Sequence, residues 1–125
     1  MKFAKTVYLI AGVYGLLIVP PQYFLEHQNS VTFPPPINHP EYYYGFIGVT
    51  VAWQIAFVII SRAPERYRPL MLATVVERYT YAFAILLLYA QARIASLIIV
   101  APALIDLVLG TLFAIAYMKV RSSMR

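Results

Sequence analysis

Four long apolar stretches constrain this chain more than any other feature of its sequence. They cover approximately residues 6–25, 42–61, 69–91 and 95–117. A helix that crosses a bilayer needs roughly 20 apolar residues, and each stretch supplies about that number. In lipid, a helix satisfies all of its own backbone hydrogen bonds. We therefore predict an all-α fold, an integral membrane bundle of four transmembrane helices, with residues 1–125 forming a single transmembrane domain.

The composition supports this prediction and excludes several classes of function. Of the 125 residues, 62% are hydrophobic and only 12% are charged, far from the composition of a soluble globule. Four spans use almost the whole chain, so we expect no soluble catalytic domain. The chain has no cysteine, which excludes disulfides, thiol redox chemistry and cysteine-ligated zinc or iron–sulfur clusters.

The basic residues predict the orientation of the bundle. Arg93 alone follows the third stretch on one side, whereas eight basic residues fall on the other: Lys2, Lys5, Arg62, Arg66, Arg68, Lys119, Arg121 and Arg125. Cytoplasmic loops are enriched in lysine and arginine, so we predict that both termini are cytoplasmic (N-in/C-in). The net charge of +5 then has a topological explanation, and we predict no nucleic-acid binding.

The segment between the first two spans, residues 26–41, is rich in proline and contains no lysine or arginine. Proline favours extended chain and cannot donate a backbone hydrogen bond. We therefore expect an outer loop that is extended and semi-rigid rather than helical.

Small residues recur along three of the spans and predict where helices approach closely. They are Ala11, Gly12 and Gly15 in the first, Gly45, Gly48, Ala52 and Ala56 in the second, and Ala103, Gly110 and Ala114 in the fourth. We interpret these stripes as packing seams within the bundle; the alternative is a homodimer contact.

Polar side chains near the middle of the membrane form the main candidate site. Asp106 lies near the centre of the fourth span, and Glu77 and Arg78 lie ~5 Å to the cytoplasmic side of the midplane of the third. Gln54 of the second span comes out ~4 Å from the midplane on that same side. Ionisable residues within a span are costly and usually face the interior of the bundle, so we expect these side chains to lie together.

Three hypotheses account for this cluster. In the first, Arg78 is neutralised by Glu77 and Asp106, and the network only determines which helices pair. In the second, the cluster belongs to a cavity that binds a lipid, a quinone or a sterol-like molecule and is lined by Tyr14, Trp53, Gln54, Glu77, Tyr81 and Asp106. In the third, the two acids relay protons in a carrier.

The sequence favours neither a metal nor a cofactor. His27 and His39 both fall in the outer loop, whereas haem held within a bundle needs histidines on facing helices. Their spacing from Glu26 and Glu41 matches no established metal-ligand pattern. We therefore predict no metal site and assign no cofactor.

The layout of the chain resembles the small bacterial four-helix membrane proteins of DoxX-like type. The resemblance rests on three features: the run His39-Pro-Glu-Tyr-Tyr-Tyr-Gly-Phe-Ile-Gly, the pair Trp53-Gln, and the connection Arg62-x-Pro64-x-Arg66-Tyr67-Arg68-Pro69. It implies a bacterial plasma (inner) membrane, and some members of that group are implied to be accessory subunits of quinone-linked oxidoreductases. Sterol-isomerase-like and sigma-2-receptor-like proteins share the general plan, with acids around a sterol-sized cavity. The resemblance transfers no residue role.

Two hypotheses for the function follow. The first is an accessory or structural subunit of a larger membrane complex, linked to quinone or electron transfer, with membrane lipids, other subunits or a second copy as partners. It is favoured slightly because the chain has no redox ligand of its own. The alternative is a self-contained membrane binder, or an isomerase-like protein, whose lipid, quinone or sterol-like ligand occupies a cavity at the acids.

Overall fold

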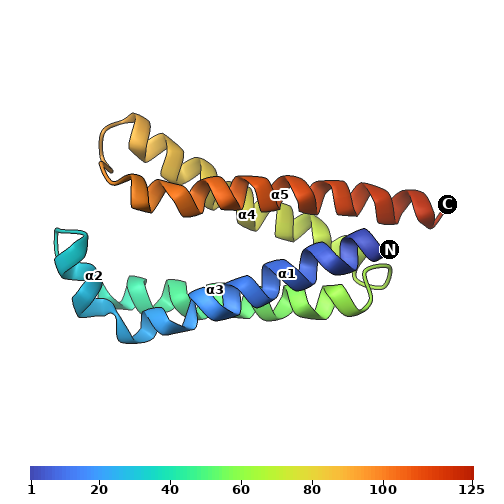
Figure 1. The fold of residues 1–125 in the computed structure, drawn as a ribbon, viewed down its shortest axis with the longest axis horizontal. Helices are drawn as coiled ribbons and strands as arrows, with labels where there is room; N and C mark the ends of the chain where they lie inside the picture. The colour runs from blue at the N-terminus through green and yellow to red at the C-terminus, as the bar shows by residue number, and fades with distance from the viewer.

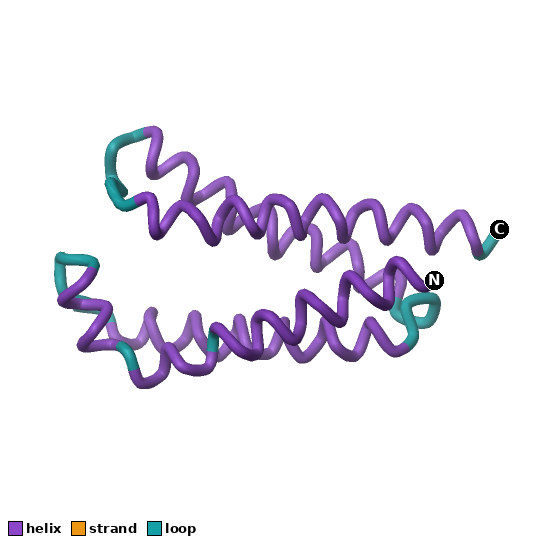
Figure 2. The backbone as a smooth tube through the Cα atoms, viewed as in Figure 1, coloured by secondary structure: helices purple, strands orange, loops and turns teal.

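A computed structural model describes residues 1–125, and the chain is all-helical (Figures 1 and 2). Its elements are α1 (Lys2–Ile18), the 3-10 helix η1 (Pro20–Phe24), α2 (Glu26–Thr32), α3 (Pro40–Arg62), α4 (Arg68–Ala90) and α5 (Leu97–Ser123). Four segments are long and apolar enough to cross a membrane: α1 with η1, α3, α4 and α5. The prediction of an all-α fold with four membrane-length helices is confirmed.

The ends of the helices follow from local chemistry. Pro20 and Pro21 stop α1 and lead into η1, because proline cannot continue an α-helix. At the end of α4, Ala92 adopts a left-handed conformation with φ 59°. The amide of Arg93 then donates to the carbonyl of Leu88 at 2.9 Å, and that of Ala92 to Tyr89 at 3.0 Å. These two bonds form a Schellman motif and turn the chain sharply back toward α5.

The expectation of an extended loop over residues 26–41 is wrong for its first part. Residues Glu26–Thr32 form α2, a short helix that has Glu26 in its first turn. The prolines begin only at Pro34, so nothing prevents helix formation before them, and an acid at a helix N-terminus is favourable. The fourth predicted span corresponds to α5, which extends beyond the predicted limit at residue 117, to Ser123.

The four long helices form two pairs that meet at one end and separate at the other. Helix α1 packs along α3, and α4 packs along α5. The pairs are joined mainly through α1 and α5, whereas α3 and α4 make few contacts. Figure 1 shows both termini and the α3–α4 connection at the end where the pairs converge. At the opposite end, which carries α2 and the α4–α5 turn, the pairs diverge (Figure 2).

The buried core occupies the end of the bundle where the pairs converge. Its ten residues come from all four long helices: Ala4, Val7, Tyr8, Ala11, Phe57, Ile60, Met71, Phe113, Ala116 and Val120. Tyr8 lies at its centre, stacked on Phe113 with ring centroids 4.3 Å apart. Its hydroxyl forms a 2.7 Å hydrogen bond with the Thr74 hydroxyl, which links α1 to α4. The two helix pairs are therefore fastened together at this end.

Two of the three predicted small-residue seams are packed within the bundle. Gly12 and Gly15 of α1 lie directly against α3, and Gly110 of α5 lies against Tyr79 and Arg78 of α4. The third predicted seam, on α3, is wrong for two of its four residues: Gly45 has nothing near the position of a Cβ, and Ala52 is exposed. Because α3 turns its other faces to α1 and the interior, this part of the stripe lies on the outer surface. Gly48 lies against the Tyr23 hydroxyl.

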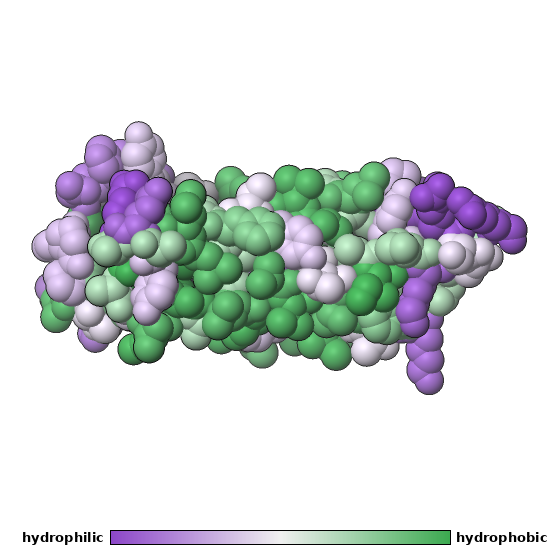
Figure 3. Space-filling model, turned by 90° about the horizontal axis from the view of Figure 1, so that it is seen from above, coloured by the Kyte–Doolittle hydropathy of each residue, from purple (hydrophilic) through white to green (hydrophobic).

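The surface of the bundle has the character expected in lipid. Figure 3 shows apolar side chains across the middle of the molecule and hydrophilic ones gathered at its two ends. Large apolar residues such as Leu17, Ile98 and Val108 are more than half exposed. An exposed apolar surface of this extent is typical of an integral membrane protein.

Candidate functional site

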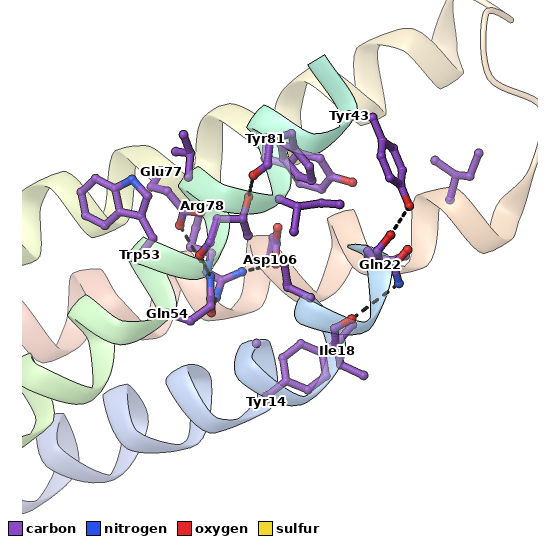
Figure 4. A pocket seen from close by; sticks show the side chains of 18 of the residues that line it. Tyr14, Ile18, Gln22, Tyr43, Trp53, Gln54, Glu77, Arg78, Tyr81 and Asp106 are labelled. Carbon is purple, nitrogen blue, oxygen red and sulfur yellow. Dashed lines mark hydrogen bonds and ion pairs between the residues drawn. The ribbon is translucent and has the colours of Figure 1, made fainter. Parts of the chain in front are cut away.

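Arg78 of α4 is the centre of the polar cluster, which Figure 4 shows from close by. Its Nη1 donates to Asp106 Oδ1 of α5 at 2.7 Å, and its Nη2 donates to Gln54 Oε1 of α3 at 3.0 Å. Its Nε lies 3.5 Å from Glu77 Oε2. The structure thus brings together the four polar residues that the sequence places at one depth, and one guanidinium connects three helices.

Neighbouring residues hold the members of the cluster in position. The Arg78 guanidinium lies over the Phe57 ring, with its central carbon 5.0 Å from the ring centroid, so an aromatic side chain of the core supports it. The Gln54 amide nitrogen donates to the Thr50 carbonyl at 3.0 Å, which directs its oxygen toward Arg78. Gly15 of α1 makes room for Gln54, because a Cβ there would overlap the Gln54 side chain.

A pocket of about 880 Å³ opens next to this cluster, between the two helix pairs where they diverge. All seven residues named from the sequence line it: Tyr14, Trp53, Gln54, Glu77, Arg78, Tyr81 and Asp106. Of its 23 lining residues, 13 are hydrophobic, and the polar ones include Gln22, Asn29 and Thr80 as well as the cluster. The pocket is therefore open and mainly apolar, with the charged groups gathered at the cluster. The cluster separates this pocket from the packed core, since Phe57 lies on the core side of Arg78.

The two acids present part of their surface to the pocket. The Glu77 side chain is 20% exposed and that of Asp106 is 14% exposed, whereas Arg78 is only 6% exposed. One carboxylate oxygen of Asp106 accepts a hydrogen bond from Arg78, and one carboxylate oxygen of Glu77 lies near the Arg78 Nε. The second oxygen of each has no hydrogen-bond partner in the chain and is not sealed off from the pocket. A molecule in the pocket would thus meet carboxylate oxygens before it met the arginine.

Residues beyond those predicted complete the pocket at its wider end. Phe46 of α3 and Ile98, Ile99 and Pro102 of α5 supply apolar walls, and Phe33 and Ile37 come from the segment after α2. Apolar residues within an apolar span carry no signal that distinguishes a pocket wall from a lipid-facing surface. Pro102 alone stands out, because proline within a helix removes a backbone hydrogen bond.

Helix α2 lies beside the pocket and is tied to only one of the two helix pairs. The Tyr43 hydroxyl donates to the Gln22 carbonyl at 2.6 Å and accepts from the Asn29 amide at 3.1 Å. The Tyr44 hydroxyl donates to Glu26 at 2.7 Å. Helix α2 packs on η1 and on neither α4 nor α5. Two tyrosines at the start of α3 thus attach α2 to that helix.

The polar residues of the outer segment have local partners instead. His39 Nδ1 lies 2.9 Å from Glu41 Oε1, and both side chains are more than half exposed. Glu26 accepts from Tyr44, as described above. No group of three or more histidine and acidic residues comes together in this chain.

Comparison of this chain with protein-family models, with curated proteins and with solved structures found no match. The chain has four helices that are long and apolar enough to span a membrane, and the DoxX-like resemblance stays a prediction from layout. The candidate site therefore stands on the geometry of the pocket alone.

Proposed function

We propose that this protein binds an amphipathic molecule within the membrane, in the pocket between its two helix pairs. The observation that carries the proposal is the combination of about 880 Å³ of space with a mainly apolar lining and charged groups at one place in it. Small-molecule sites usually enclose ~300–1,000 Å³ and combine apolar walls with a few convergent polar groups. A lipid, a quinone or a sterol-like compound has the matching form, with one polar head and an apolar body.

The placement of the charged groups supports this role over a purely structural one. A network that only pairs helices is best closed on all sides, because unpaired polar atoms are costly in a membrane. Here Glu77 and Asp106 keep carboxylate oxygens turned to open space. The apolar walls at the wider end, including Ile98 and Ile99, favour entry of the ligand from the lipid phase.

The charge distribution supports an orientation with both termini in the cytoplasm, and the layout of the chain favours a bacterial plasma membrane. The termini and the basic α3–α4 connection lie at the same end of the bundle (Figure 1), as the positive-inside rule requires of cytoplasmic segments. In this orientation the pocket widens toward the outer leaflet, and the acids lie near the middle of the bilayer.

The test is to identify small molecules that the protein retains after gentle extraction, using native mass spectrometry. Wild-type protein is compared with Thr50→Trp, which fills the pocket, and with Val108→Trp, a change of similar size on the exposed face of α5. We expect a retained molecule with wild type and Val108→Trp and its loss with Thr50→Trp. A retained molecule that survives Thr50→Trp, or none in any sample, contradicts the proposal.

A second candidate function is that of an accessory subunit of a larger membrane complex, linked to quinone or electron transfer. The observation that favours it is the outer face of α3, where Gly45 and Ala52 leave the backbone uncovered by this chain. Small residues permit close helix approach in lipid, so another subunit or a second copy would fit there. The same mass spectra test it, because other subunits in a fixed ratio would establish a complex and a homodimer would appear at twice the mass.

A further inference from the structure

The hydrogen-bonding groups that remain free in the pocket indicate which kind of head group it accepts. We infer that the ligand presents a head that donates hydrogen bonds, such as a hydroxyl group, rather than one that only accepts them, such as a carbonyl or an ether. This inference rests on the proposed function and adds the chemistry of the polar head to it.

The Arg78 and Gln54 side chains bond to the protein, and the Arg78 Nε is buried away from the pocket. Arg78 directs two nitrogens at Asp106 and Gln54 and holds the third beside Glu77. Its side chain is only 6% exposed and lies over Phe57. The amide nitrogen of Gln54 donates to Thr50. A ligand that could only accept hydrogen bonds would therefore depend on the Tyr14, Tyr81 and Trp53 side chains rather than on Arg78 or Gln54.

The acceptors, by contrast, exceed what the protein uses. An ionised carboxylate offers about four acceptor positions and no donor. Asp106 accepts one bond at 2.7 Å, and Glu77 has only the 3.5 Å approach of Arg78. Both side chains face the pocket more openly than Arg78 does.

Other lining groups are consistent with the same polarity. Pro102 has no N–H with which to reach the carbonyl of Ile98 one turn earlier, and both residues line the pocket. The hydroxyls of Tyr14 and Tyr81 line it too and can either donate or accept. A hydroxyl head could thus donate to Glu77 or Asp106 while accepting from a tyrosine.

Trp53 allows a direct test, because it lines the pocket and is the only tryptophan in the chain. The protein is placed in phosphatidylcholine nanodiscs and titrated with dodecan-1-ol or with its methyl ether, 1-methoxydodecane. The two probes share a dodecyl chain and an oxygen, and the ether carries a methyl group in place of the hydroxyl hydrogen, so only the alcohol can donate a hydrogen bond. Binding is followed by Trp53 emission and compared at equal mole fraction in the bilayer.

We expect the alcohol to saturate the Trp53 signal at a concentration at least ~10-fold below that of the ether, since a hydrogen bond to a charged group is worth ~1.5–3 kcal/mol. Glu77→Gln should reduce this preference several-fold, because it replaces a carboxylate with a group that both donates and accepts. Glu65→Gln removes the same charge from the exposed α3–α4 connection and should leave the preference unchanged.

The outcomes separate the two proposals. Equal binding of alcohol and ether, or an undiminished preference in both Glu77→Gln and Asp106→Asn, would overturn the donor inference and leave the binding function standing. A Trp53 signal that responds to neither probe would contradict the pocket as a binding site, and the inference with it. Circular dichroism of each variant establishes that the helices are intact.

Discussion

Replacing Arg78 with alanine should weaken the connection between the two helix pairs more than any other single change at the cluster. Arg78 belongs to α4 and donates across to Gln54 of α3 at 3.0 Å, and these two helices otherwise make few contacts. The same guanidinium holds Asp106 of α5 at 2.7 Å. Its removal leaves both acids without a cation.

The expected cost follows from the environment of these bonds. Breaking a buried ion pair by removing one partner typically costs ~3–5 kcal/mol. Two features reduce this figure: the acids are 20% and 14% exposed to the pocket, where water can solvate them, and measured polar contacts between membrane helices average only ~0.6 kcal/mol. We therefore expect Arg78→Ala to lower the free energy of unfolding by about 2–3 kcal/mol.

Asp106→Asn provides the comparison. An asparagine keeps an oxygen that can accept a hydrogen bond from Arg78 and loses only the charge. We therefore expect Asp106→Asn to lower the free energy of unfolding by about 1 kcal/mol. Arg121→Ala serves as a control, because Arg121 is exposed near the end of α5 and should have almost no effect. Both values can be measured from unfolding in mixed micelles of dodecylmaltoside and increasing sodium dodecyl sulfate, followed by far-ultraviolet circular dichroism and Trp53 emission.

The order of the two effects decides whether the reasoning is correct. If Arg78→Ala costs no more than Asp106→Asn, the acids do not depend on the arginine and the cluster does not join the helix pairs. A larger loss in Asp106→Asn would instead identify the aspartate as the residue that positions the others.

Three further changes test other parts of the structure. Gly15→Ala should displace Gln54 from Arg78 and cost about 1–3 kcal/mol in the same unfolding assay. Gly45→Ala should instead stabilise the protein by up to about 1 kcal/mol, because nothing lies near its Cβ and alanine favours a helix more than glycine does. Equal effects would contradict the close α1–α3 seam. Tyr43→Phe removes the hydroxyl that joins Gln22 and Asn29, so the amides of α2 should exchange with deuterium roughly 5–10-fold faster, and unchanged exchange would show that α2 is held by other contacts. Ala92→Gly should stabilise the protein by about 1 kcal/mol, since glycine adopts the left-handed conformation at φ 59° without the strain of a Cβ, and a loss of stability would argue against that turn.

The long helices and the cluster could be predicted because the membrane makes their signals strong. An apolar run of about 20 residues has few alternatives to a span. A charged residue inside such a run is rare enough that its depth, at about 1.5 Å per residue, locates its partners. Depth alone places Gln54, Glu77 and Asp106 near one another, and Arg78 contacts all three.

The shape of the pocket could not be predicted, because lipid and protein interior are equally apolar. Phe46 and Ile99 face the pocket, whereas Val108 faces outward, yet all three are large apolar residues within a span. The helix pairs pack together around Tyr8 at one end only, and no periodicity in the sequence reveals this. The helix over Glu26–Thr32 escapes prediction because the prolines that follow it dominate the composition of the whole segment.

The packed core and the pocket occupy different halves of the bundle and have no residue in common. Disturbed core packing is one main cause of large destabilisation, and the exposed or half-buried residues at the wide end of the pocket fall outside that constraint. Residues such as Ile98, Ile99 and Phe46 can therefore vary over evolutionary time, or in a mutagenesis library, while the protein continues to fold. A scaffold organised in this way can acquire a new ligand preference through single substitutions at the wide end of its pocket.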